Sequence, residues 1–157
     1  MKRKIFVLPI LVMVVLMSLL NSCGNKEQYS KEYIERDLKA FLAEYVNTMN
    51  DNIGGCLSKD YNAVISKWQA NESLGEYNLF GLNSSATVEK YSILGISEPI
   101  DDRVCAQVTL SVEDEDNYRD EKVNIYLTLE NDKWLVDEID EVKQGMKNAL
   151  EEYKTAK

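Results

Sequence analysis

The spacing of apolar residues changes near Ala86, and this change restricts the fold more than any other feature of the sequence. Before Ala86 the apolar residues recur every three or four positions, which is typical of helices with one buried face. After Ala86 they recur at every second position, which is typical of strands with one buried face. Helices first and strands afterwards predict an α+β fold, in which N-terminal helices pack on a curved antiparallel sheet.

Two helices are expected before the sheet. The first spans about Ser30 to Asn50, because one face carries Ile34, Leu38, Phe41, Leu42, Tyr45, Val46 and Met49. Ser30 can cap this helix, and Gly54-Gly55 ends the pattern. The second helix is expected from about Ser58 to Gln69. Residues 70 to 85 are rich in glycine and asparagine, so we expect a long loop packed by its own apolar side chains.

About four strands are expected, joined as consecutive antiparallel hairpins. Their ranges are Thr87–Ile96, Val104–Val112, Val123–Glu130 and Lys133–Ile139. The acidic segment Glu113 to Asp120 is expected to form the loop of the central hairpin. A C-terminal helix is expected from about Glu141 to Tyr153, because apolar residues again recur at helical spacing there.

The first 22 residues have the pattern of a signal peptide. Basic residues at positions 2 to 4 precede a mainly apolar stretch from Ile5 to Leu20, which is short for a membrane span of about 20 apolar residues. The site Leu20-Asn21-Ser22-Cys23 resembles the lipobox of bacterial lipoproteins. This resemblance implies that the leader, residues 1–22, is removed and that Cys23 carries acyl chains such as palmitate. A transmembrane anchor and an ordinary cleaved leader are the alternatives.

Lipidation at Cys23 would attach the chain to a bacterial cell membrane, since two or three acyl chains anchor a protein stably. The outer membrane of a Gram-negative cell is the expected location, and the periplasmic and surface sides are both left open. Residues 23–29 would form a short tether. Residues 30–157 would form a single domain, because this length fits one core.

The chain is acidic and contains no histidine. Its formal charge is −9, and it becomes −12 if Lys2, Arg3 and Lys4 leave with the leader. Phosphate backbones and anionic lipid heads repel such a surface, so nucleic acid is not an expected partner and attachment to the membrane must come from the lipid. The absence of histidine excludes Ser-His-Asp and Cys-His hydrolases and His-ligated zinc.

Two cysteines remain after Cys23. In an oxidising compartment Cys56 and Cys105 can form a disulfide, and the alternative is a pair of buried free thiols. The sequence favours neither.

The segment Val123 to Ile139 (VNIYLTLENDKWLVDEI) and the long first helix resemble the nuclear-transport-factor-two-like, cystatin-like superfamily, in particular its uncharacterised bacterial lipoproteins. The resemblance implies a sheet that curls round the helices into a cone, whose mouth can hold a small molecule. Several enzymes of the superfamily place an aspartate with a histidine or tyrosine in that mouth. Here only a carboxylate and a tyrosine such as Tyr91 or Tyr126 could form the pair.

The aromatic residues are the candidate pocket lining, and packing in the core is the alternative. They are Trp68, Tyr77, Phe80, Tyr91, Tyr126 and Trp134. The spacing favours core packing, because Trp68 continues the apolar face of its helix and Trp134 fits the alternation of its strand. No catalytic set, cofactor motif or metal site is expected. The acidic run Asp114 to Glu121 lacks EF-hand spacing, because Arg119 stands at the glycine position and Ile125 at the closing glutamate.

These features predict a membrane-anchored, non-catalytic domain that binds a protein or small ligand in the cell envelope. One alternative is an inhibitor or immunity-type lipoprotein against a basic cell-wall hydrolase, since a strongly acidic domain is steered onto cationic partners. Another is an enzyme of the same fold that uses aspartate and tyrosine. We further expect the partner surface at the end of the domain remote from the anchor, near Asn50 to Gly55.

Overall fold

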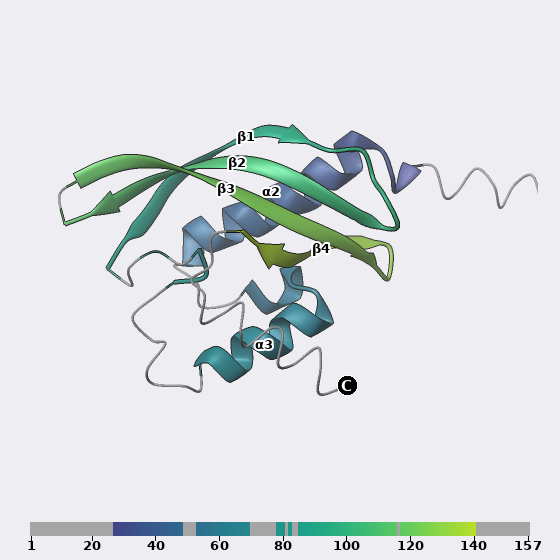
Figure 1. Ribbon diagram of the computed structural model, residues 1–157, viewed down its shortest axis with the longest axis horizontal. Helices are drawn as coiled ribbons and strands as arrows, with labels where there is room; N and C mark the ends of the chain where they lie inside the picture. The colour runs from purple at the N-terminus through teal and green to yellow at the C-terminus, as the bar shows by residue number, and fades with distance from the viewer. Residues whose placement is uncertain are drawn as a thin grey trace, which may run out of the picture.

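The computed structural model describes residues 27–48, 53–69, 78–80, 82, 85–115 and 117–140 (Figure 1). Helix α2 (Lys31–Thr48), the 3-10 turn η1 (Ile53–Cys56) and helix α3 (Lys59–Gln69) come before the strands. The strands are β1 (Thr87–Ile96), β2 (Arg103–Asp114), β3 (Asn117–Glu130) and β4 (Lys133–Ile139). This order confirms the α+β class, while the expected C-terminal helix lies outside the described residues.

The four strands form one antiparallel sheet in the order β1-β2-β3-β4, so every strand pairs with its neighbour in sequence. The turns at 101–102 and 131–132 both have two residues with positive φ, between 49° and 64°. Aspartate and asparagine tolerate this backbone, which matches the twist of a tight hairpin. Both turns lie at the same end of the sheet, because hairpin turns alternate between the two ends.

The central hairpin is longer than expected. The segment Glu113 to Asp120 is not a loop: β2 continues to Asp114, and β3 begins at Asn117. Side chains stabilise the extension, since Tyr118 donates to Glu113 at 2.7 Å and Ser111 donates to Asp120 at 2.9 Å across the two strands. Polar pairs of this kind support strands that no core covers.

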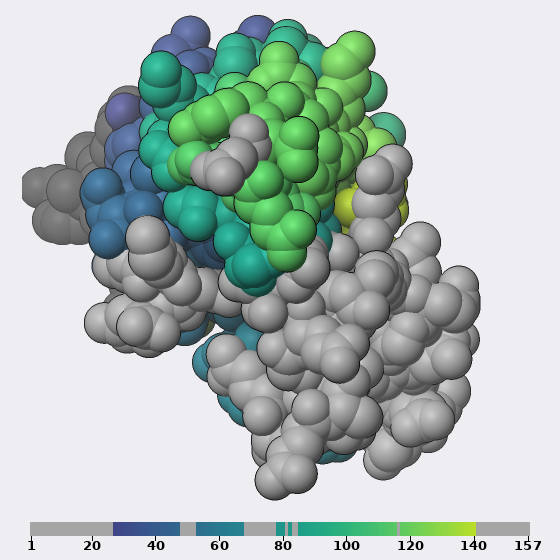
Figure 2. Space-filling view, turned by 90° about the vertical axis from the view of Figure 1, so that its left-hand side faces the viewer, coloured from purple at the N-terminus to yellow at the C-terminus, as the bar shows by residue number. Residues whose placement is uncertain are grey.

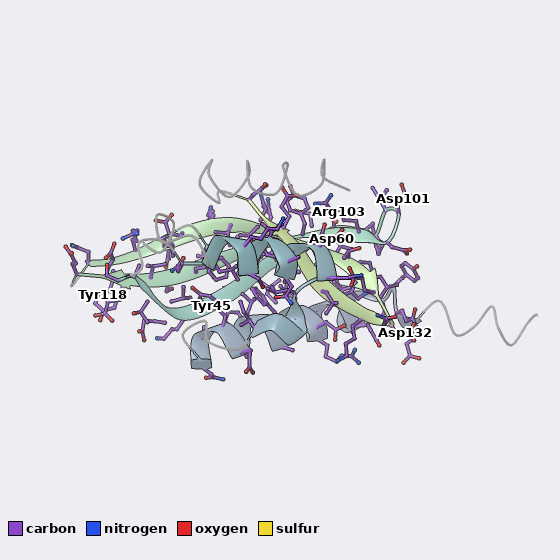
Figure 3. All side chains as sticks on the ribbon, turned by 90° about the horizontal axis from the view of Figure 1, so that it is seen from below. Tyr45, Asp60, Asp101, Arg103, Tyr118 and Asp132 are labelled. Carbon is purple, nitrogen blue, oxygen red and sulfur yellow. The ribbon has the colours of Figure 1, made fainter. Side chains whose placement is uncertain are left out.

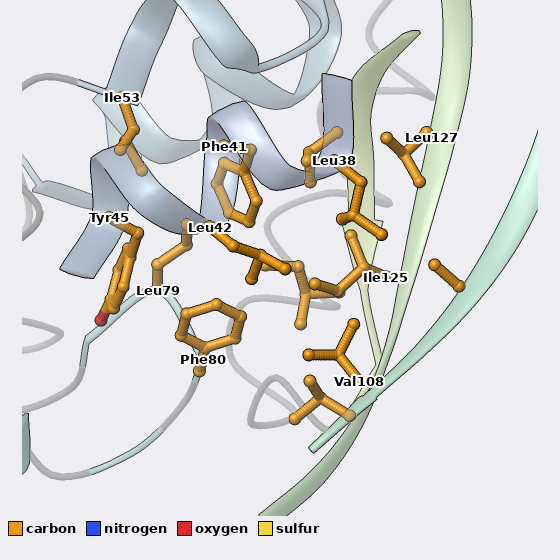
Figure 4. Close-up of a cluster of buried hydrophobic side chains, with 14 of the residues drawn as sticks. Leu38, Phe41, Leu42, Tyr45, Ile53, Leu79, Phe80, Val108, Ile125 and Leu127 are labelled. Carbon is orange, nitrogen blue, oxygen red and sulfur yellow. The ribbon is translucent and has the colours of Figure 1, made fainter. Parts of the chain in front are cut away.

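Helix α2 packs against one face of the sheet, which we call the inner face (Figure 4). Leu38, Phe41 and Leu42 of the helix meet Val108, Ile125 and Leu127 of the strands, and all six are almost fully buried. Serines cap both helices, as expected for α2: the Tyr33 amide donates to Ser30 Oγ at 3.2 Å, and the Tyr61 amide donates to Ser58 Oγ at 3.1 Å. No helix among the described residues is long and apolar enough to span a bilayer.

Two described pieces of the segment 70–85 also contribute to the core. The side-chain oxygen of Asn78 accepts from the amides of Phe80 and Leu82, at 3.0 and 3.1 Å, and so forms a local turn. The turn places Leu79 and Phe80 in the core, where the Phe80 ring meets Tyr45 edge to face at 4.6 Å (Figure 4). The described apolar side chains of this segment therefore pack into the common core, while most of the expected loop lies outside the described residues.

Candidate functional site

The face of the sheet away from α2, which we call the outer face, is polar. Alternation buries Val104, Ala106, Val108 and Leu110 of β2 on the inner face and turns the intervening residues outward. Outward residues of β2 and β3 include Arg103, Cys105, Gln107, Thr109, Lys122, Asn124, Tyr126 and Thr128. Among the described residues no helix packs on this face, and Arg103, Gln107 and Lys122 are exposed there.

A hollow of about 460 Å³ lies on the outer face, near the turn between β1 and β2. We call it the outer hollow. Its lining combines charged groups with one aromatic ring and one thiol: Ser97, Glu98, Ile100, Arg103, Val104, Cys105, Tyr126, Glu138 and Asp140. It is shallow and open, and its size suits a small polar molecule or the side chains of a partner.

Arg103 organises one side of the outer hollow. Its guanidinium donates to Glu138 at 2.6 Å, lies 3.8 Å from Asp137 and sits over the Tyr126 ring with 4.9 Å to the centroid. Both carboxylates can reach it because a β-bulge interrupts the pairing of β3 with β4 at this point: Tyr126 pairs with Glu138 and Leu127 with Val136, so Asp137 is the extra residue.

Asp140 organises the other side. Its Oδ2 accepts from the Tyr126 hydroxyl at 3.0 Å and from the Asn124 amide at 3.2 Å, while its own backbone amide donates to the Asn124 carbonyl at 2.8 Å. The hydrogen bond to Asp140 is the main cause that raises the pKa of Tyr126 to about 12. The hydroxyl is therefore protonated at neutral pH and acts as a hydrogen-bond donor.

Asp137 connects the outer hollow to α3. Ser58 Oγ donates to Asp137 at 2.9 Å, and the Ser58 amide donates to the Val136 carbonyl at 2.8 Å, which continues the parallel bridge between Leu57 and Val136. Ser58 thus caps α3 and supports the bulge that brings Asp137 towards Arg103. The geometry of the outer hollow depends in this way on the docking of the second helix.

The disulfide that the sequence allowed is not formed, since Cys56 and Cys105 are both free. Cys56 packs beside the core on the helical side of the sheet, while Cys105 pairs with Tyr126 and faces outward. The sheet separates the two thiols. Burial raises the pKa of each of them.

The structure describes the side chains of four of the six aromatic candidates. Phe80 and Trp134 are 2% exposed and belong to the core, and Tyr91 packs half-buried against it. Tyr126 does line a hollow, but on the outer face instead of inside a cone. The Trp68 side chain and Tyr77 lie outside the described part of the chain.

Sequence reasoning missed Arg103, Glu138 and Asp140 as members of the site. The alternation alone could have placed Arg103, Cys105 and Tyr126 on one face. The bulge at Asp137 could not have been found this way, because a single extra residue leaves no clear periodic signal in a seven-residue strand.

Tyr126 and Asp140 are also the tyrosine and carboxylate that the enzyme alternative requires. Asp140 already accepts two hydrogen bonds, and the raised pKa of Tyr126 keeps its hydroxyl protonated at neutral pH. Among the described residues, no three His, Cys, Asp or Glu side chains are grouped as metal ligands.

Comparisons with known proteins give one informative likeness. No protein-family model matches the chain, and no curated protein matches it. Its fold is similar to the solution structure of a SEC-C motif containing protein from Rhodopseudomonas palustris, with 13% identity and a TM-score of 0.51 over 72% of this chain and 79% of that chain. At this identity the likeness concerns the fold alone and supports the helices-then-sheet arrangement.

Replacing Asp140 should lower the pKa of Tyr126. In Asp140→Asn the negative acceptor is lost, so we expect that pKa to move from about 12 towards the ordinary value of 10.0. Because the folded pKa lies above the unfolded one, the stability gained from the pair is complete below pH about 10 and is lost as the pH rises to about 12. The near-ultraviolet absorbance of tyrosinate, followed against pH, measures the shift. The transition that disappears in Tyr126→Phe is the one that belongs to Tyr126. An unchanged titration would contradict this account of the hydrogen bond.

Proposed function

We propose that this chain is a lipid-anchored, non-catalytic binding domain of the bacterial cell envelope. Acyl chains on Cys23 hold it at the membrane of a Gram-negative cell, and the outer face of its sheet binds a protein or a small polar ligand. The observation that carries the binding function is the outer hollow, where Arg103, Tyr126 and Asp140 are held in place by hydrogen bonds on an otherwise polar face.

The chemistry of the outer hollow favours binding over catalysis. Two of its three carboxylates, at positions 138 and 140, are already paired, with Arg103 and with Tyr126 and Asn124. The third, Glu98, is exposed to solvent, whereas a catalytic carboxylate needs a buried environment. Paired and pre-positioned groups reduce the entropy lost when a ligand is bound. They can also exchange an internal hydrogen bond for one to the ligand.

The anchor is tested by lipid incorporation. Cells that express the full chain and are fed an alkyne analogue of palmitate should label the wild-type protein but not Cys23→Ala, because the sulfur that is acylated is gone. Cys56→Ala is the matched control and should be labelled like the wild type. Labelling of Cys23→Ala at the wild-type level would exclude Cys23 as the acylation site.

The binding surface is tested by comparing two outer-face cations. Arg103→Ala should lose the ligand or partner that the wild type retains from an envelope extract, because the hollow then loses the group that holds Glu138 in place. Lys122→Ala is the control, since Lys122 lies on the same face but not in the hollow. Quantitative mass spectrometry of the retained proteins and small molecules gives the readout. Equal retention by both variants would exclude the outer hollow as the binding surface.

A second candidate function is inhibition of a basic cell-wall hydrolase, and the central hairpin favours it. The tip of β2 and β3 extends beyond α2 (Figure 1), and it forms the near surface of the molecule when seen from this end (Figure 2). Tyr118 is 73% exposed there, and Glu115 and Asp120 are exposed beside it. An acidic arm with an exposed aromatic ring suits a cationic cleft.

Charge reversal at the hairpin tests this second function. Glu115→Lys should weaken inhibition of a cationic cell-wall muramidase, measured as the rate of peptidoglycan hydrolysis at low salt. Asp101→Lys is the matched control, because it makes the same change in net charge at an exposed turn residue of similar φ at the opposite end of the sheet, and it should leave inhibition intact. If both variants have the same effect, or if the wild type does not inhibit, the hairpin is not an inhibitory arm.

A further inference from the structure

We propose that the end of the sheet opposite the hairpin tip contacts the lipid headgroups of the membrane to which the domain is anchored. We call it the anchor end, and it consists of Tyr29, Ile100–Asp102 and Asn131–Asp132. This inference rests on the proposed lipid anchor at Cys23. It adds a contact surface and an orientation that the anchor alone does not require.

The N-terminal segment is fastened to both turns of the anchor end. Gln28 donates to the Asp132 carboxylate at 2.7 Å, and the Tyr29 hydroxyl donates to Asp102. The Trp134 indole in turn donates to the Gln28 carbonyl at 2.7 Å, and the Tyr29 and Trp134 rings meet edge to face at 6.0 Å. The chain therefore enters the domain at a defined place, between the two turns.

Helix α2 strengthens this attachment from its first turn. The Tyr33 hydroxyl donates to the Asp132 carbonyl at 2.9 Å, and the Trp134 amide donates to the Asp37 carboxylate at 2.9 Å. The entry segment, the helix and the turn between β3 and β4 thus form one hydrogen-bonded unit. Residues 27–30 belong to the folded domain and do not lengthen the tether.

The free tether is consequently short. Only three residues, Gly24 to Lys26, separate Cys23 from Glu27. The Cα atoms of Cys23 and Glu27 therefore lie at most about 14 Å apart, at ~3.5 Å per residue. The ladder between β2 and β3 runs from Arg103–Thr128 to Asp114–Asn117, which is about 36 Å at ~3.3 Å per residue. The anchor end therefore stays close to the bilayer, while the hairpin tip can stand far from it, as the positions of Asp101, Asp132 and Tyr118 illustrate (Figure 3).

The anchor end is suited to this contact although it carries acidic turns. Asp102 and Asp132 are already hydrogen-bonded to Tyr29 and Gln28, so they need no lipid partner. Ile100 is 72% exposed and offers an apolar side chain to the interface. The contact is imposed by the tether and does not depend on electrostatic attraction. The outer hollow begins at the same turn, so its ligand would be bound near the headgroup layer.

Fluorescence quenching by headgroup-labelled lipids tests the orientation. Ile100→Cys and Tyr118→Cys are matched label sites, because the two side chains are 72% and 73% exposed at opposite ends of the sheet. Both are made with Cys56→Ala and Cys105→Ala in the lipoprotein purified from membranes and reconstituted in vesicles. We expect quenching at position 100 to exceed quenching at position 118 several-fold. Glu98→Cys and Asn117→Cys, also exposed at the two ends, give an independent pair if either first variant misfolds.

A second arm separates the orientation from natural lipidation. Residues 1–23 are replaced by a histidine tag joined to Gly24 and bound to nickel-chelating lipid, and every described core residue, from Ile34 to Ile139, is retained. The chain has no histidine of its own that could compete. Equal quenching at the two ends, or more at position 118, would overturn the orientation. If labelling with the palmitate analogue shows no lipid on Cys23 and the second arm still shows the gradient, the natural anchor is refuted and the orientation is kept.

Discussion

The structure depends on the burial of one face of β2 and β3 against α2. Six side chains of these elements form the centre of the contact, and each is almost completely removed from water: Leu38, Phe41, Leu42, Val108, Ile125 and Leu127. Complete burial of such a side chain contributes about 1.5–3 kcal/mol. Because strand side chains alternate, burying one face commits every second residue to the other face, and the polar outer face follows from the same contact.

Most of the fold could be predicted because it depends on local periodicity. The Ser30 cap, the extents of α2 and α3, and the order of four antiparallel strands all follow from spacing and turn residues within a few positions. The hairpin between β2 and β3 was predicted with too long a loop, since its end is held by cross-strand pairs such as Tyr118 with Glu113, and acidic composition alone indicates a loop.

The site could be predicted much less well. The six aromatic candidates were chosen by residue type. Whether such a side chain lies in the core or lines a hollow depends on the face of its helix or strand that carries it and on the residues that cover that face. Trp134 lies on the buried face of β4, as the alternation of that strand indicates, and its indole reaches the carbonyl of Gln28, 106 residues earlier in the chain. Arg103 gains its two carboxylates through a bulge in β4. Contacts between distant segments determine the partner of the Trp134 indole and the bulge, and no local pattern indicates either of them.

The even number of strands gives this domain two unlike ends. In a four-stranded meander, the first and third turns lie together and the central turn lies opposite. Here the first and third turns are two-residue turns that receive the N-terminal segment through Tyr29 and Gln28. The central hairpin receives no such contact from the described part of the N-terminal segment, and it extends past α2 with polar side chains paired across its strands (Figure 1). If Cys23 is anchored as we propose, this topology would separate the attached end from the exposed hairpin by the full length of the sheet.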